Sequence, residues 1–119
     1  MKAVARYASG FVYFVSVTGV TGARTATPVG IEPLVARGRE IVGLPVGVGF
    51  GISTAEQAVE VAAYADLVIV GSALTRAMCE AGSGGAVDAC SEFIAALRRG
   101  LDDAATAGRL GRRALGHAQ

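Results

Sequence analysis

The feature that most constrains this chain is the alternation of apolar runs with helical patterns. The runs are FVYFVSV, VGVGF and DLVIVGS, at residues 11–17, 46–50 and 66–72. None shows strict polar alternation, which indicates strands covered on both faces, as in parallel sheets. Helical patterns lie between them, so the order predicts right-handed βαβ crossovers and an α/β protein with a parallel sheet.

The helical segments have recognisable faces and ends. Residues 31–41 place Ile31, Leu34 and Val35 on one face, and residues 1–8 read as the last turns of another helix. Ser53 and Glu56 have the spacing of a capping box that opens a third helix. A short helix over residues 73–80 and a long one over 86–107 follow. The long one carries an apolar seam of Val87, Cys90, Ile94, Leu97 and Leu101.

Composition and charge exclude several classes of function. Half of the residues are hydrophobic and 17 are glycine, which suits helices packed closely on a sheet, while a net charge of +1 favours neither nucleic acid nor a membrane surface. No apolar run approaches the roughly 18 residues needed to span a bilayer, and no signal peptide is evident. Cys79 and Cys90 read as reduced, apolar residues of a cytoplasmic protein. His117, the sole histidine, has no partners for a metal site.

Glycine-bearing segments follow each predicted strand. They are TGVTGAR after the first run, GFGIST after the second and GSAL after the third, contributing Gly22, Gly51, Gly71 and Ser72. Ligands of α/β proteins bind at the carboxyl ends of parallel strands, and backbone N–H groups near a helix N-terminus favour anions. These segments therefore suggest a phosphate site. The plainer interpretation, that the glycines serve turns and helix packing, stays open on spacing alone.

Three segments together resemble one known family. ASGFVYFVSVTGVTGAR, LPVGVGFGISTAEQA and ADLVIVGSAL match, in order and spacing, the C-terminal part of the tryptophan synthase α chain. The resemblance spans roughly residues 7–101. It implies a partial (βα) TIM-barrel, with the three strands being the sixth to eighth. It also implies a lyase that cleaves indole-3-glycerol phosphate to indole and glyceraldehyde 3-phosphate without a cofactor.

The resemblance assigns roles to particular residues. Gly22, Gly51, Gly71 and Ser72 match the positions that hold the substrate phosphate, mainly through backbone N–H groups. Tyr13, Thr21 and Phe50 match residues close to the substrate, with Thr21 on a mobile loop that closes over the site.

The family's catalytic pair is the main departure. The glutamate and aspartate that act as general acid and base would lie upstream of Met1. Asp66 stands at the wrong end of its strand, and Glu56 reads as a helix cap. Without a positioned acid or base, indole cannot be protonated on leaving. We therefore expect the chain alone to be inactive.

The expected organisation is one unit over residues 1–108 and a frayed basic tail over 109–119. The resemblance implies a pyridoxal-phosphate-bearing β chain as partner of the full-length protein. An alternative is a non-catalytic, phosphate-binding partial barrel that self-associates through its open sheet edges. A barrel enzyme for another phosphosugar is disfavoured by the GFGIS and VTGVTG segments.

Overall fold

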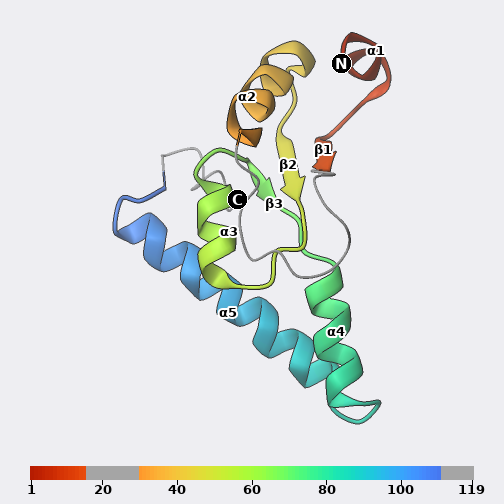
Figure 1. The fold of residues 1–119 in the computed structure, drawn as a ribbon, viewed down its shortest axis with the longest axis vertical. Helices are drawn as coiled ribbons and strands as arrows, with labels where there is room; N and C mark the ends of the chain where they lie inside the picture. The colour runs from red at the N-terminus through yellow and green to blue at the C-terminus, as the bar shows by residue number, and fades with distance from the viewer. Residues whose placement is uncertain (16–29, 111–119) are drawn as a thin grey trace.

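A computed structural model describes residues 1–15 and 30–110. Its elements follow the predicted order (Figure 1). They are α1 (Lys2–Tyr7), β1 (Val12–Val15), α2 (Ile31–Val42), β2 (Val46–Gly49), α3 (Ala55–Ala62), β3 (Leu67–Val68), α4 (Ser72–Ala81) and α5 (Ala86–Thr106). The predicted alternation and the long final helix are confirmed.

The three strands form a parallel sheet in the order β1-β2-β3. Tyr13 lies opposite Gly47, and Gly47 opposite Leu67, so these three residues share one face. The other face carries Val46 and Val48, which are fully buried. A regular pleat thus divides the sheet into two faces of different character.

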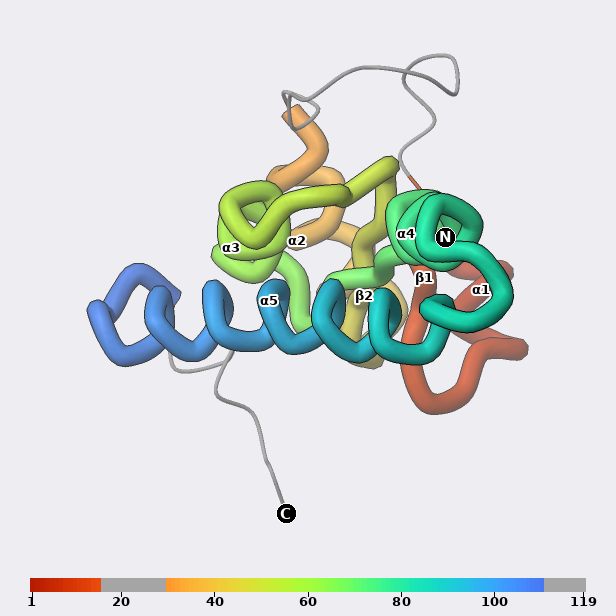
Figure 2. The backbone as a smooth tube through the Cα atoms, turned by 90° about the horizontal axis from the view of Figure 1, so that it is seen from below, coloured from red at the N-terminus to blue at the C-terminus, as the bar shows by residue number. Residues whose placement is uncertain are grey.

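Helices α2, α3 and α5 bury one face of the sheet. Val46 and Val48 join a core cluster with Ile31, Val35, Ala58, Val61 and Leu97. Figure 2 shows α5 running lengthwise past α3 at one end and α4 at the other, and both helices contact it. Val59, Ala104 and Leu110 form a smaller cluster at the α3–α5 end. Leu110 belongs to the segment expected to fray; residues 111–119 lie outside the described part.

The expectation that every strand is covered on both faces is wrong for β1 and for Leu67 of β3, which is 42% exposed. The burial of β1 alternates, leaving Tyr13 and Val15 about half exposed, because the helices of residues 1–15 and 30–110 cover one face of the sheet. Leu34 is likewise exposed on α2, where Gly38 takes the buried position beside Ile31 and Val35. On α5, Val87 and Ile94 are exposed, and Leu97 is the buried member of the predicted seam.

The helix cap after the second strand begins one residue later than predicted. The N-cap of α3 is Thr54, whose Oγ1 accepts from the Gln57 amide at 3.2 Å. The Gln57 Oε1 in turn accepts from the amides of Ser53 and Thr54, at 2.9 and 3.3 Å. Both registers satisfy the capping-box spacing, and the structure selects the one that buries Gln57 and leaves Glu56 exposed.

Candidate phosphate site at the carboxyl edge of the sheet

The segments that follow β2 and β3 lie at the same edge of the sheet, because the two strands are parallel neighbours. Gly51 lies two residues after the end of β2 and is exposed with a φ of 51°, a left-handed conformation that favours glycine. An added Cβ at Gly51 would meet nothing within 4 Å. The backbone at Gly51 is therefore open to an approaching ligand on its glycine side.

The second segment feeds helix α4. Gly71 is its N-cap and supplies no side-chain cap, while Ser72 is the first helical residue; both are exposed. The first amides of a helix have no acceptor within the helix. They point outward at its positive end, which favours an anion. This geometry suits a phosphate group held by backbone N–H groups.

The two described residues expected near the substrate have different surroundings. Tyr13 is 49% exposed and its side chain crosses to β2, where a Cβ on Gly49 would lie 2.6 Å from the Tyr13 Oη. Phe50 is half-buried against the main core. Thr21 and Gly22 lie outside the described residues.

The alternating glycines of β2 thus make room for neighbouring side chains. A Cβ on Gly47 would come within 2.8 Å of the Ile69 Cδ1, as one on Gly49 would meet Tyr13. Both glycines belong to the face opposite Val46 and Val48, against which none of the described helices is packed. The lack of a side chain at Gly47 and Gly49 allows the side chains of the adjacent strands to approach β2 closely.

We expect Gly49→Ala to displace Tyr13 and to lower the free energy of unfolding by about 1 kcal/mol, because the new methyl overlaps the Tyr13 hydroxyl. Adding Tyr13→Phe removes that hydroxyl. The double variant should recover about 0.5 kcal/mol relative to the sum of the single changes. Urea unfolding of the four proteins measures this coupling; strictly additive effects would contradict the proposed contact.

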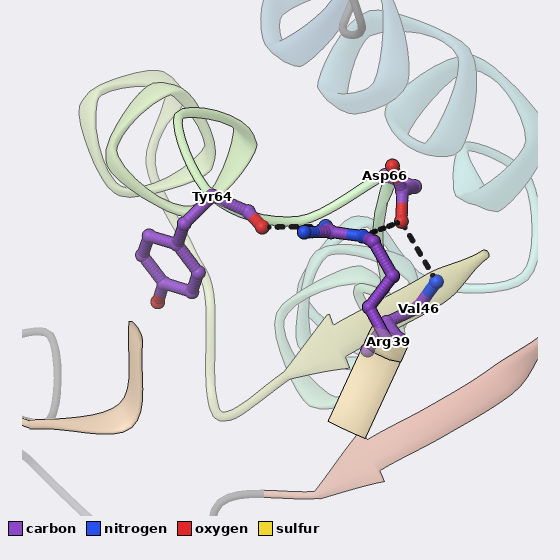
Figure 3. Close-up of polar contacts among 4 residues, drawn as sticks. All are labelled: Arg39, Val46, Tyr64 and Asp66. Carbon is purple, nitrogen blue, oxygen red and sulfur yellow. Dashed lines mark hydrogen bonds and ion pairs between the residues drawn. The ribbon is translucent and has the colours of Figure 1, made fainter. Parts of the chain in front are cut away.

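The opposite, amino edge of the sheet holds an ion-pair cluster (Figure 3). The Asp66 Oδ2 accepts from the Arg39 Nε and from the Val46 amide, both at 2.9 Å. The Arg39 Nη2 donates to the Tyr64 carbonyl at 2.8 Å. The Asp66 carboxylate therefore joins α2, β2 and the turn before β3. This agrees with its predicted position at the amino end of the third strand. It is not placed to act at the carboxyl edge.

Tyr64 itself points away from this cluster (Figure 3). Burial raises the pKa of its hydroxyl, and the carboxylates of Glu32 and Glu60 raise it further. Its Oη is buried and has no hydrogen-bond partner among the described residues. This perturbed group belongs to the α3–β3 turn, outside the candidate site.

Sequence reasoning missed Arg39 and Gln57 as structural polar residues. Arg39 is one of two arginines on α2, and its partner is 27 positions away in the sequence, so no local pattern indicates the contact. Among the described residues, no group of three or more histidine, cysteine, aspartate or glutamate side chains could hold a metal ion. Nor is any described helix long and apolar enough to cross a membrane.

Comparison with known proteins identifies the family. The family profile described as "Tryptophan synthase alpha chain" matches residues 1–105, most of the chain. The chain belongs to the tryptophan synthase α-chain family. A relative from Phenylobacterium zucineum is 47% identical over 113 residues, which cover 95% of this chain and 39% of the relative. Another, from Acidothermus cellulolyticus, is 58% identical over 77 residues, or 65% of this chain and 29% of that one.

Solved structures agree on the fold. The α chain from Legionella pneumophila superposes with a TM-score of 0.69 at 29% identity, over 84% of this chain and 36% of the solved one. Tryptophan synthase from M. tuberculosis, in an aminoacrylate- and BRD0059-bound form, gives 0.64 at 33% identity, over 83% and 33%. The partial βα-barrel is thereby confirmed. The chain spans little more than a third of the length of the relatives it matches.

Proposed function

We propose that this chain provides the phosphate-binding part of a tryptophan synthase α-type lyase acting on indole-3-glycerol phosphate. The observation that carries the proposal is the pair of open backbone segments at one sheet edge, Gly51 after β2 and Gly71-Ser72 at the start of α4. Gly22 and Thr21 would complete the site from the loop after β1, as the family resemblance implies. Tyr13 and Phe50 would lie beside the rest of the substrate.

The proposed role is anchoring, with the chemistry supplied from elsewhere in the barrel. Aldol cleavage to indole and glyceraldehyde 3-phosphate requires an acid for the indole ring and a base for the glycerol hydroxyl. Asp66, the acidic residue nearest a strand, is bonded at the amino edge instead. In the proposed pathway the indole passes to a pyridoxal-phosphate-bearing β chain, and the reaction is cytoplasmic.

The test separates binding from turnover. Purified chain is titrated with indole-3-glycerol phosphate while the backbone amide resonances of Gly51, Gly71 and Ser72 are followed, and indole release is assayed in parallel. We expect saturable shifts at these amides and no indole above the buffer background. Indole release by the chain alone would overturn the assignment of the acid and base to other residues.

A matched pair of variants at Ser72 tests the backbone contact. Ser72→Pro removes the first amide of α4 at a position where proline is compatible with a helix, whereas Ser72→Ala removes only the hydroxyl. We expect Ser72→Pro to weaken binding about tenfold, the size of one lost charge-assisted hydrogen bond, and Ser72→Ala to bind nearly as the parent does. Equal binding by both variants would contradict phosphate capture at α4.

A further inference from the structure

Gln57 on α3 is the one polar or charged residue that is buried among the described residues, with 6% of its surface exposed. A buried amide side chain costs free energy unless its polar atoms are hydrogen-bonded. The Gln57 Oε1 accepts from the Ser53 amide at 2.9 Å, from the Ser53 hydroxyl at 3.2 Å and from the Thr54 amide at 3.3 Å. This buried oxygen therefore holds the chain just before α3.

The segment between β2 and α3 is held mainly by side chains. Within residues 1–15 and 30–110, no backbone-to-backbone hydrogen bond involves Gly51, Ile52 or Ser53. The Ile52 side chain is 1% exposed and packs in the main core. The Gln57 oxygen and the Ile52 side chain thus fix the segment on the α3 side of Gly51.

Gly51 lies between these contacts and the strand. It follows the end of β2 by two residues and precedes Ser53 by two, and its glycine side is open. A backbone amide binds an anion more tightly when its direction is fixed beforehand, because ordering a loose segment on binding costs free energy. The readiness of the Gly51 amide to bind therefore depends on how firmly Ser53 is held.

We propose that Gln57 is a positioning residue for the phosphate site, acting through its hydrogen bonds to Ser53 and Thr54 rather than by contact with the substrate. The assignment rests on the phosphate-binding role proposed above and adds the side chain that prepares the Gly51 backbone for it. Without the Gln57 oxygen the segment would populate its binding conformation less, and the apparent dissociation constant rises in inverse proportion to that population.

Titration of the full chain with indole-3-glycerol phosphate, followed at the Gly51 amide resonance, tests the proposal. Gln57→Met keeps the length of the side chain but lacks the amide oxygen. It should weaken binding about tenfold, because two backbone hydrogen bonds that order the segment are lost. Val59→Ala is the matched control. Val59 lies on the same helix in the smaller core cluster, so this change loosens the packing of α3 but should leave the dissociation constant unchanged.

Gln57→Glu is the rescue variant. It keeps an oxygen acceptor at the third position of the capping box, and salt at about 0.2 M screens its added charge, so it should bind about threefold more tightly than Gln57→Met. If Gln57→Met does not fold, Gln57→Asn takes its place and should show the same loss of affinity, because its side chain is one methylene shorter and its oxygen is drawn back from the Ser53 amide.

Binding by Gln57→Met as tight as that of the parent would overturn the positioning role while leaving the phosphate site in place. Equal weakening by Gln57→Met and Val59→Ala would also overturn it, since Gln57 would then act only through the stability of α3. So would a Gln57→Glu variant that binds no better than Gln57→Met. A parent chain that binds no indole-3-glycerol phosphate would overturn the proposed function itself, and the positioning role with it.

Discussion

Asp66→Ala should lower the free energy of unfolding by about 3 kcal/mol, since a hydrogen bond to a charged group contributes about 1.5–3 kcal/mol and two are lost. The Asp66 carboxylate accepts from the Arg39 side chain and the Val46 amide with the same oxygen. Its side chain is 23% exposed, so water reaches the site and keeps the loss below the sum of two fully buried bonds. Chemical denaturation measures the change.

Asp102 provides the control for that experiment. It pairs with Arg98 one turn away on α5, and both side chains are more than half exposed. Water screens the attraction in such exposed pairs, so Asp102→Ala should be nearly neutral. The loss in the free energy of unfolding caused by Asp66→Asn should lie between those of Asp66→Ala and Asp102→Ala, because an amide oxygen still accepts one hydrogen bond. If Asp66→Ala were as mild as Asp102→Ala, the cluster in Figure 3 would not stabilise the amino edge of the sheet.

Gly100→Ala should destabilise the chain by about 1–3 kcal/mol, although glycine inside a helix is ordinarily about 0.5–1 kcal/mol worse than alanine. An added Cβ at Gly100 of α5 would lie 2.7 Å from the Cβ of Ala55 at the start of α3. Neither atom can turn away, because a Cβ has no rotamer of its own. The two helices must separate, and they share the core that contains Leu97 and Ala58.

For Gly38 on α2 we expect the opposite effect of alanine on stability. It is buried within the helix, yet an added Cβ would meet only the Met1 Sδ, at an ordinary contact distance of 3.9 Å. Gly38→Ala should therefore stabilise the chain by about 0.5–1 kcal/mol through helix propensity. Thermal or urea unfolding of the two variants should give shifts of opposite sign. Stabilisation by Gly100→Ala would contradict the close crossing of α3 and α5.

The sequence predicted correctly those features for which a residue pattern is compatible with one kind of structure. Alternating apolar runs and helical periods predicted the element order, and the long helix was predicted within one residue of its observed end at Thr106. The glycine-bearing segments that contain Gly51 and Gly71 were correctly predicted to follow their strands, whereas the one that contains Gly22 lies outside the described residues. What they bind stays a prediction, as do the roles of Tyr13 and Phe50.

The errors in predicted burial share a cause, which is that the burial of a side chain depends on which other elements of the fold pack against it. Leu34, Val87 and Ile94 fit apolar helix faces, yet they are exposed because no described element covers them. The capping box had two registers in S-T-A-E-Q, and periodicity alone could not distinguish Ser53 from Thr54. Arg39 and Asp66 meet only through the fold, so no local pattern reports their contact.

Helices α3 and α4 both begin shortly after a strand, but only α3 has a side-chain capping box. At α3, side chains of the protein itself engage the amides of Ser53, Thr54 and Gln57. At α4, no side chain caps the first turn. In hydrogen–deuterium exchange, the Gln57 amide should therefore be protected with or without ligand, while the Ser72 amide should gain protection only when an anion is bound. The Gln57 amide is thus an internal reference against which binding of an anion at the start of α4 can be measured.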